Sequence, residues 1–323
     1  MTAQSNLDTL VTIFGGSGFL GRHLVRALAK RHYRIRVAVR RPELAGYLQP
    51  LGRVGQIHAV QANLRHSASI NAVVQESDIV INLVGILFER GAQRFETVQA
   101  EGAGAVARAA TQHGARMIHV SAIGADEHSE SIYARTKAEG EKRVLIAAPT
   151  ATVFRPSIMF GPDDDFFNRF AAMARMSPFL PLVGGGTTRF QPVFAGDVAA
   201  AIALAVDGKT APGSIYELGG PDVFTFKELM EFVLATIERK RLLIPLPFFL
   251  ARLQAVFLQL MPKPMLTTDQ VELLKHDNVV SEQALRDHRT LSALGIEPHT
   301  VASIVPEYLW RFRKTGQFRD RVA

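Results

Sequence analysis

The stretch Gly15-Gly16-Ser17-Gly18-Phe19-Leu20-Gly21 decides the fold of this chain. It follows the apolar run Leu10–Phe14, which predicts a strand, and it opens Phe19–Lys30, where apolar residues recur with helical spacing. Glycines at 15, 18 and 21 permit a tight turn and let the backbone approach a pyrophosphate, while the helix N-terminus offers free N–H groups. The stretch therefore predicts a strand–turn–helix unit that holds a dinucleotide. The alternative is a tight turn with no ligand.

The first 160 residues alternate short apolar runs with helical patterns, which is typical of βαβ units and a parallel sheet. Further strands are expected at Ile35–Val39, Ile57–Gln61, Ile79–Val84, Met117–Ser121 and Thr152–Arg155. Helices are expected at Ser69–Gln75, Phe95–His113 and Tyr133–Ile146. We therefore predict an α/β fold, with a doubly wound parallel sheet of the Rossmann type over residues 1–160.

The pattern loosens after Arg155. Residues 161–186 are rich in Gly, Pro and Phe, which favours loops around a cleft, and from Phe226 onward the chain is mostly helical with proline punctuation. Residues 190–220 contain a predicted helix, Asp197–Val206, and a short strand, Ser214–Leu218, that return to the first domain. We assign residues 161–189 and 221–323 to a smaller, mostly helical lobe for substrate or docking.

The composition excludes several kinds of site. Of 323 residues, 47% are hydrophobic and 21% are charged, as in an ordinary packed protein. The chain has no cysteine, which excludes disulfides, thiolate metal sites and cysteine nucleophiles. Its ten histidines are scattered without metal-ligand spacing, so we expect no metal.

The net charge of +7 is unevenly placed along the chain. Residues 9–42 hold eight Arg or Lys and no acid, and the tail 309–323 holds five Arg or Lys and one acid. A protein that coats nucleic acid would be basic throughout, so we expect no nucleic-acid partner. The patches favour a phosphate ligand near the N-terminus and a docking or lipid contact near the C-terminus. No leader is visible before Leu10, so we expect a chain that is cytosolic, bacterial or already processed, and we assign it to the cytoplasm.

The position about 20 residues past the glycine stretch discriminates between nucleotides. NAD-specific sites place Asp or Glu there, whereas this chain reads Val37-Ala38-Val39-Arg40-Arg41 with no acid before Glu43. An acid would repel a 2′-phosphate, and Arg40 would pair with it. We predict NADP(H) as the cofactor in preference to NAD(H). The alternative is that both arginines are solvated surface charges.

Ser121 ends the fifth predicted strand, and Tyr133 and Lys137 lie four residues apart at the start of the next helix. That spacing puts the phenol and the ammonium on one helix face. A nearby ammonium lowers the pKa of a phenol from about 10 and suits it for acid–base work. Lys can also bind a nicotinamide ribose, and Ser a substrate oxygen. The set predicts a ligand-facing site, with an ordinary surface pair on a helix as the alternative.

With these residues the chain resembles the extended or atypical branch of the short-chain dehydrogenase/reductase superfamily. The matching motifs include Gly15–Gly21, Ala62-Asn63-Leu64, Asn82-Leu83-Val84-Gly85 and Arg155-Pro156-Ser157-Ile158-Met159-Phe160-Gly161. Asn63 replaces the usual Asp, and an amide can still hydrogen-bond adenine. The pattern and the resemblance together assign cofactor binding to Gly15, Ser17, Gly18, Phe19, Leu20, Gly21, Arg40, Asn63, Leu64, Leu83, Val84, Gly85, Ser121, Tyr133, Lys137 and Pro156.

Within that branch the chain is most similar to the NADPH-binding accessory subunits of respiratory complex I, in their bacterial form. The similarity rests on His119-Val120-Ser121-Ala122, Tyr133–Glu141, Gln191-Pro192-Val193 and Lys275-His276-Asp277-Asn278-Val279-Val280. In those subunits the nucleotide is regarded as structural, with no established turnover. The resemblance therefore implies complex I subunits as partners, a peripheral position on the inner membrane, and a Ser–Tyr–Lys set that binds NADPH without reductase chemistry.

Two C-terminal segments are candidates for docking. Leu242–Met261 is strongly apolar, and its prolines restrict the predicted helix to Phe248–Met261, too short to span a bilayer. We expect this helix to lie on an anionic membrane surface, to dock on a partner, or to be buried in its own lobe. Trp310-Arg311-Phe312-Arg313-Lys314 predicts a docking peptide, a phosphate binder or an exposed end.

The favoured function is an NADP(H)-holding accessory subunit. The second is a free NADP-dependent reductase or epimerase, in which Tyr133 donates a proton, Lys137 tunes it and Ser121 holds the substrate oxygen. The apolar segments Phe160–Asn168 and Gly184–Val193 would then suit a hydrophobic carbonyl substrate. The third is a regulatory NADPH sensor.

Overall fold

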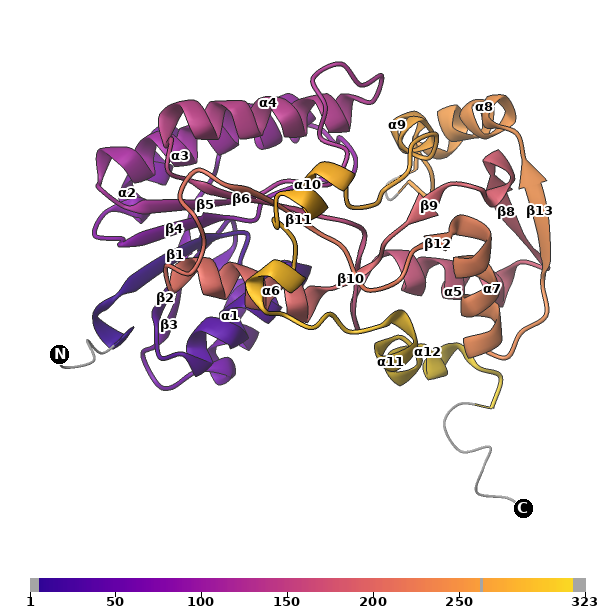
Figure 1. Cartoon of the computed structure of the whole chain (residues 1–323), viewed down its shortest axis with the longest axis horizontal. Coiled ribbons are helices and arrows are strands. Elements are labelled where there is room, and N and C mark those ends of the chain that lie inside the picture. The colour runs from indigo at the N-terminus through magenta and orange to yellow at the C-terminus, as the bar shows by residue number, and fades with distance from the viewer. Residues whose placement is uncertain (1–5, 262–263, 316–323) are drawn as a thin grey trace. The chain divides into compact units, whose positions relative to one another are not determined.

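The computed structural model describes residues 6–261 and 264–315, and the chain divides into two compact units (Figure 1). Unit 1 takes its described residues from Met1–Pro156, Ala195–Leu218 and Glu282–Ile296. Unit 2 takes its described residues from Ser157–Phe194, Gly219–Ser281 and Glu297–Ala323.

Unit 1 is built on a seven-stranded sheet in the order β11-β6-β5-β4-β1-β2-β3, in which every neighbouring pair is parallel. The strands are β1 (Leu10–Phe14), β2 (Arg34–Val39), β3 (Ile57–Gln61), β4 (Ile79–Asn82), β5 (Arg116–Val120), β6 (Thr152–Pro156) and β11 (Ile215–Leu218). All residues of β1 and β4 are buried, as expected where helices cover both faces of a parallel sheet. The predicted Rossmann-type sheet is confirmed.

Helices cover both faces of this sheet (Figure 1). One face carries α1 (Phe19–Lys30) and α6 (Ala195–Val206), and the other carries α2 (Ser67–Val74), α3 (Gly102–Gln112) and α4 (Ile132–Ala147). The helices η2 (Pro42–Leu51) and α10 (Glu282–Arg286) also belong to this unit. The strand order reverses direction at β1, and in such sheets ligands bind at this switch point, outside the carboxyl ends of the strands.

The predicted helix Phe95–His113 is present, and its first turns are π-helical. A π-helix, η3 (Glu96–Glu101), precedes α3. The backbone carbonyl of Gln99 in η3 lies against α4 at Gly140, where an added Cβ would come within 2.3 Å of it. A wider turn does not change which residues are apolar, so the hydrophobic period could not indicate it.

Unit 2 has three two-stranded sheets and a phenylalanine-rich core. The strand pairs are β7 (Met159–Phe160) with β10 (Val193–Phe194), β9 (Arg189–Phe190) with β12 (Phe224–Thr225), and β8 (Phe179–Val183) with β13 (Leu242–Leu246). The helices are α5 (Phe166–Met176), α7 (Phe226–Thr236), α8 (Phe248–Leu258), α9 (Thr268–Leu273), α11 (Val301–Ile304) and α12 (Pro306–Leu309). Phe160, Phe167 and Phe226 are buried in the core.

The prediction of loops over residues 161–186 is wrong, because α5 and β8 occupy most of this range. Its aromatic residues pack on one another within unit 2, as Phe166 does on Phe167 and Phe170. The expectation of a mostly helical part after Phe226 also missed β13, which pairs in parallel with β8. The proline in this strand excludes a helix and is tolerated in a strand at the edge of a sheet.

The segment Trp310–Phe312 is not a free end, because it forms the helix η6 and packs on unit 2. Phe312 is buried, and its carbonyl accepts a hydrogen bond from Arg239 Nε at 3.0 Å. Arg313 Nε donates to the carbonyl of Thr236 at 3.0 Å. Residues 316–323 of the predicted basic tail lie outside the described residues.

Candidate functional site

The glycine stretch forms the turn between β1 and α1. Gly15 has a φ of +80°, and an added Cβ would lie 3.2 Å from the side chain of Val84. Gly18 caps α1, and its N–H donates to the carbonyl of Gly15 at 2.9 Å. A Cβ at Gly21 would come within 2.5 Å of this turn. The glycines thus bring the first turn of α1 and its free N–H groups against the end of β1, the arrangement that a phosphate-binding turn requires.

Arg40 and Arg41 follow the carboxyl end of β2. Both side chains are exposed, and neither has an ion-pair partner among the described residues. Arg22, which the sequence places in the first turn of α1, does have an interaction partner. The arginine pair is therefore available to an anionic ligand at this edge of the sheet.

Asn63 and Leu64 follow β3, where the side-chain oxygen of Asn63 accepts the N–H of Arg65 at 3.1 Å. Leu64 packs against Gly102 of α3. The turn after β4 is fixed in a similar way, because Asn82 Oδ1 accepts the N–H of Val84 at 3.1 Å. This hydrogen bond ends β4 two residues earlier than the sequence predicted.

Ser121 and Lys137 meet at the carboxyl end of β5. Lys137 is buried, and its Nζ donates to the carbonyl of Val120 at 3.3 Å, directly before Ser121. The Ser121 hydroxyl is buried without a hydrogen-bond partner among the described residues. Lys137 Nζ lies 5.9 Å from the ring centroid of Tyr133, which packs edge-on against Phe95. The structure thus brings the three predicted residues to one edge of the sheet.

Burial lowers the pKa of Lys137 to about 8, although the nearby carboxylate of Glu141 opposes the shift. Glu141 is itself buried and pairs with Arg155, with contacts of 2.6 to 3.2 Å. Lys137 makes no ion pair of its own among the residues described. A buried ammonium without an ion-pair partner can bind a hydroxyl or favour a phenolate beside it.

The sequence did not indicate two further buried polar side chains near Lys137, those of His119 and Gln99. His119 Nδ1 lies 3.3 Å from Asn82 Nδ2, and burial followed by the Lys137 charge lowers the pKa of His119 to about 3. Gln99 Nε2 donates to Thr136 Oγ1 at 3.3 Å. His119 Nε2 and Gln99 Oε1 are buried without partners among the described residues. His119 lies in a predicted strand and Gln99 in a predicted helix. No sequence pattern indicated that either side chain would be a buried polar group beside Lys137.

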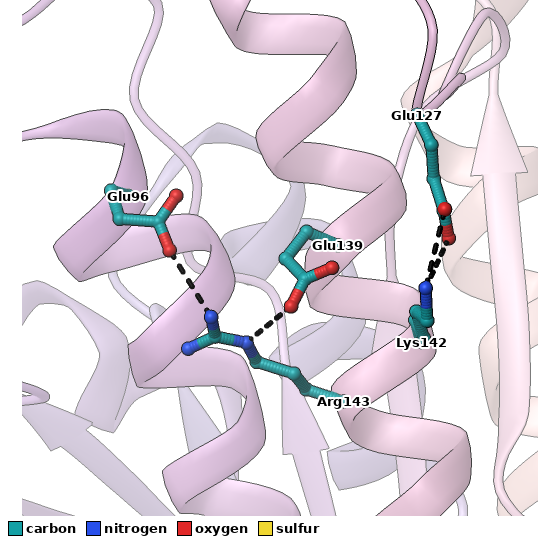
Figure 2. Close-up of polar contacts among 5 residues, drawn as sticks. All are labelled: Glu96, Glu127, Glu139, Lys142 and Arg143. Carbon is teal, nitrogen blue, oxygen red and sulfur yellow. Dashed lines mark hydrogen bonds and ion pairs between the residues drawn. The ribbon is translucent and has the colours of Figure 1, made fainter.

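Other charged side chains of α4 show a contrast with Lys137 (Figure 2). Arg143 pairs with Glu139 at 2.7 Å and with Glu96 at 3.3 Å, and Lys142 pairs with Glu127 at 3.2 Å. These charges are half-buried or exposed and compensate one another. The helix α4 therefore carries two different lysines. Lys142 is exposed and paired with Glu127, whereas Lys137 is buried without an ion pair among the described residues, and ion pairing does not explain why a charge is buried there.

Two more predicted residues, Pro156 and Gly85, also lie at the carboxyl ends of the strands. Pro156 ends β6, and its carbonyl accepts the N–H of Ile123 at 3.0 Å. A Cβ at Gly85 would lie 3.2 Å from Lys137 Nζ, so the turn after β4 leaves room for this ammonium. The Ser121 hydroxyl without a partner among the described residues, the glycine turn and the exposed arginines together fit an anionic dinucleotide.

Comparison with known families identifies the chain. The profile of the NAD dependent epimerase/dehydratase family matches residues 11–219, from β1 to the end of β11. The chain belongs to the NAD dependent epimerase/dehydratase family. This membership confirms the resemblance inferred from the sequence motifs. The site described above lies within the matched residues of the chain.

The chain is also similar to individual proteins of known name. The chain is 38% identical, over 97% of its length, to NADH dehydrogenase (ubiquinone) 1 alpha subcomplex subunit 9, mitochondrial, of Arabidopsis thaliana, and covers 80% of that protein. It is 35% identical over 74% of its length to the ceramide reductase of Caulobacter vibrioides, covering 74% of it. The first relative confirms the predicted similarity to complex I subunits.

The fold also has solved counterparts. The NADPH-dependent quinone oxidoreductase QOR2 of Escherichia coli, complexed with NADPH, matches with a TM-score of 0.73 and 20% identity. The match covers 93% of this chain and 99% of that one. At this identity the likeness concerns the fold.

A separate surface feature lies on α8 in unit 2. Ala251 and Ala255 are fully buried against Val183 and Val271, whereas the large apolar residues of this segment point outward. Between 41% and 80% of the surface is exposed for Phe249, Leu250, Leu253, Val256, Phe257, Leu260 and Met261. Of the three alternatives for this helix, burial of its large side chains in its own lobe is therefore wrong. The parts of the chain that the structure describes contain no helix long and apolar enough to cross a membrane.

Proposed function

We propose that the chain is an NADP(H)-holding accessory or assembly subunit of a membrane-bound NADH:quinone oxidoreductase, respiratory complex I, with a structural nucleotide. The observation that carries this proposal is the similarity to the Arabidopsis NADH dehydrogenase subunit, which extends over 97% of the chain and therefore over both units. Similarity restricted to unit 1 would have supported nucleotide binding alone.

In this function Gly15, Gly18 and Gly21 seat the pyrophosphate, and Arg40 selects the 2′-phosphate. The free arginine pair and the lack of an acid at the end of β2 support NADP(H) over NAD(H). Tyr133 and Lys137 hold the nicotinamide ribose. The buried ammonium supports this role, because a ribose hydroxyl would give it a second acceptor beside the carbonyl of Val120.

The membrane side of the proposal concerns α8. Residues Leu242–Met261 contain no acid, and Arg252 on the exposed part of α8 is the one basic residue among them. A helix with outward apolar side chains and a cationic neighbour suits the headgroup region of an anionic membrane. We place the protein on the cytoplasmic side of the inner membrane, with α8 and the C-terminal segment against lipid and partner subunits.

Native-gel separation of gently solubilised membranes tests the accessory role. The gel is blotted for this chain beside an in-gel NADH dehydrogenase stain. We expect the chain to co-migrate with the large active band and to remain there after a salt wash that strips loosely bound proteins. Recovery solely as a small species, with the active band intact, would contradict the proposal.

A free NADP-dependent reductase or epimerase is the second candidate, and two observations favour it. The Ser–Tyr–Lys set is complete at one sheet edge, and the chain is similar to a ceramide reductase. A bound nicotinamide would supply or accept a hydride. Ser121 would then hold the substrate oxygen, Tyr133 would give it a proton from its hydroxyl, and Lys137 would stabilise the phenolate left behind.

A substrate screen separates the two candidates. Sustained NADPH oxidation with a hydrophobic ketone, lost in Tyr133→Phe but kept in Tyr216→Phe, would establish turnover. Tyr216 is a suitable control because it packs on Phe154 in the sheet core. Absence of turnover, together with co-migration in the native gel, supports the structural role of the nucleotide.

A further inference from the structure

Tyr47 connects two parts of the candidate nucleotide site. It lies on η2, which begins directly after Arg40 and Arg41. The helix is held down by Ala45 and Leu48, each 1% exposed, whereas the Tyr47 side chain is 49% exposed. The Tyr47 hydroxyl donates a hydrogen bond of 2.5 Å to the carbonyl of Ser17 in the glycine turn.

This hydrogen bond is the second of two attachments that hold the segment containing Arg40 and Arg41. On one side, β2 holds the arginine pair through the sheet, where the carbonyl of Val39 accepts the N–H of Ala62 at 2.8 Å. On the other side, Tyr47 ties the same segment to Ser17. Arg40 and Arg41 therefore lie on a short span of chain anchored at both ends, one anchor being the phosphate-binding turn itself.

We propose that Tyr47 is a positioning residue that sets the preference for a nucleotide with a 2′-phosphate. The proposal rests on the proposed nucleotide site. In this fold the residue at the end of β2 faces the adenosine ribose, while the glycine turn holds the pyrophosphate. Tyr47 fixes the spacing between these two contact regions without needing to touch the nucleotide.

The physical effect is preorganisation. Without the hydroxyl, η2 still packs through Ala45 and Leu48, and the N–H of Gly15 still donates to the carbonyl of Ala38, but the segment after the arginines loses its side-chain hydrogen bond to Ser17. Ordering that segment then becomes part of the cost of binding. A nucleotide with a 2′-phosphate uses the arginines and bears this cost, whereas NADH makes no charge-assisted contact with them. The hydroxyl therefore acts on selectivity rather than on general affinity.

Tyr47→Phe tests the inference, since it removes the hydroxyl and keeps the ring. Dissociation constants for NADPH and NADH are measured by titration of the purified full chain. We expect the NADPH constant to rise about five-fold, the equivalent of one net hydrogen bond, and the NADH constant to stay within about two-fold. Tyr33→Phe is the matched control, because the Tyr33 hydroxyl donates to Asp207 at the opposite edge of the sheet.

The outcomes are distinct. Selective loss of NADPH affinity in Tyr47→Phe, absent in Tyr33→Phe, supports the positioning role. Equal losses for both nucleotides, or no change, would overturn it while leaving the proposed nucleotide site intact. If the unmodified chain binds neither nucleotide, both the Tyr47 role and the proposed NADP(H) site are refuted.

Discussion

Replacing Lys137 with methionine should make the nucleotide-free protein more stable and should weaken nucleotide binding. Lys137 is 5% exposed and donates one hydrogen bond, to the carbonyl of Val120. Methionine has a similar length, fills the same space and carries no charge. The substitution removes the cost of burying an ammonium and loses the one hydrogen bond that the ammonium makes in the described structure.

The magnitude follows from the pKa of Lys137, which burial lowers from 10.5 to about 8. A difference of roughly 2.5 units corresponds to about 3 kcal/mol against folding at pH 7, where the side chain is protonated in both states. Losing the hydrogen bond costs about 1 kcal/mol, so Lys137→Met should gain about 2 kcal/mol. The folded pKa is the lower one, so the unfolded chain binds more protons and the stability of the unmodified protein rises between pH 8 and about 10.5. The advantage of the variant should therefore shrink by about 2.5 kcal/mol between pH 7 and pH 10.

Urea denaturation followed by far-ultraviolet circular dichroism measures this difference, with hydrogen exchange of β5 and α4 peptides reporting on unit 1. Fluorescence is unsuitable because the sole tryptophan, Trp310, belongs to unit 2. Lys142→Met on the same helix is the matched control, since Lys142 is exposed and paired with Glu127. It should change stability by less than about 1 kcal/mol at either pH. A Lys137→Met protein that is less stable than the unmodified chain at pH 7, or whose relative stability is the same at pH 7 and pH 10, would refute the burial cost assigned to Lys137.

Three further predictions concern other parts of the chain. Arg40→Asp should weaken NADPH binding at least about ten-fold more than NADH binding by calorimetric titration, and equal losses would contradict the selection role. Gly15→Ala should cost about 1–2 kcal/mol in urea denaturation, because φ is +80° at this position, and an unchanged unfolding midpoint would argue against this backbone. Leu253→Glu combined with Phe257→Glu should leave stability within about 0.5 kcal/mol, since both side chains are exposed, but should abolish co-sedimentation with vesicles rich in anionic lipid. Retained sedimentation would remove α8 from the membrane contact.

The parallel sheet and its carboxyl edge could be predicted because their signals are local. A glycine turn after an apolar run, a basic end of β2 and a Tyr–Lys pair four residues apart each occupy a short window of sequence. Parallel topology then brings the ends of all these strands to one edge, so Arg40, Asn63 and Ser121 come to the same edge although they are far apart in the chain. Their roles in binding stay predictions.

The features that sequence did not reveal depend on contacts between distant residues. Tyr47 lies in no predicted element, and no local pattern indicates that its hydroxyl meets Ser17, 30 residues earlier. The direction of α8 is a similar case. An apolar helix can bury its large side chains or its small ones, and the hydrophobic pattern alone does not choose. The structure buries Ala251 and Ala255, which turns the large residues outward.

The buried polar atoms at the carboxyl edge of the sheet also bear on the choice between the two functions. Four buried polar groups are costly to bury, because a polar group without a partner loses its hydration. They are the Lys137 ammonium, which has no ion pair among the described residues, and Ser121 Oγ, His119 Nε2 and Gln99 Oε1. A nucleotide held permanently would offset part of this cost, and such a subunit should lose stability when the nucleotide is removed. An enzyme that releases its nucleotide in each cycle must instead be stable without it. The increase in unfolding free energy on adding NADPH, compared between Lys137→Met and the unmodified chain, therefore measures how far the fold depends on the ligand.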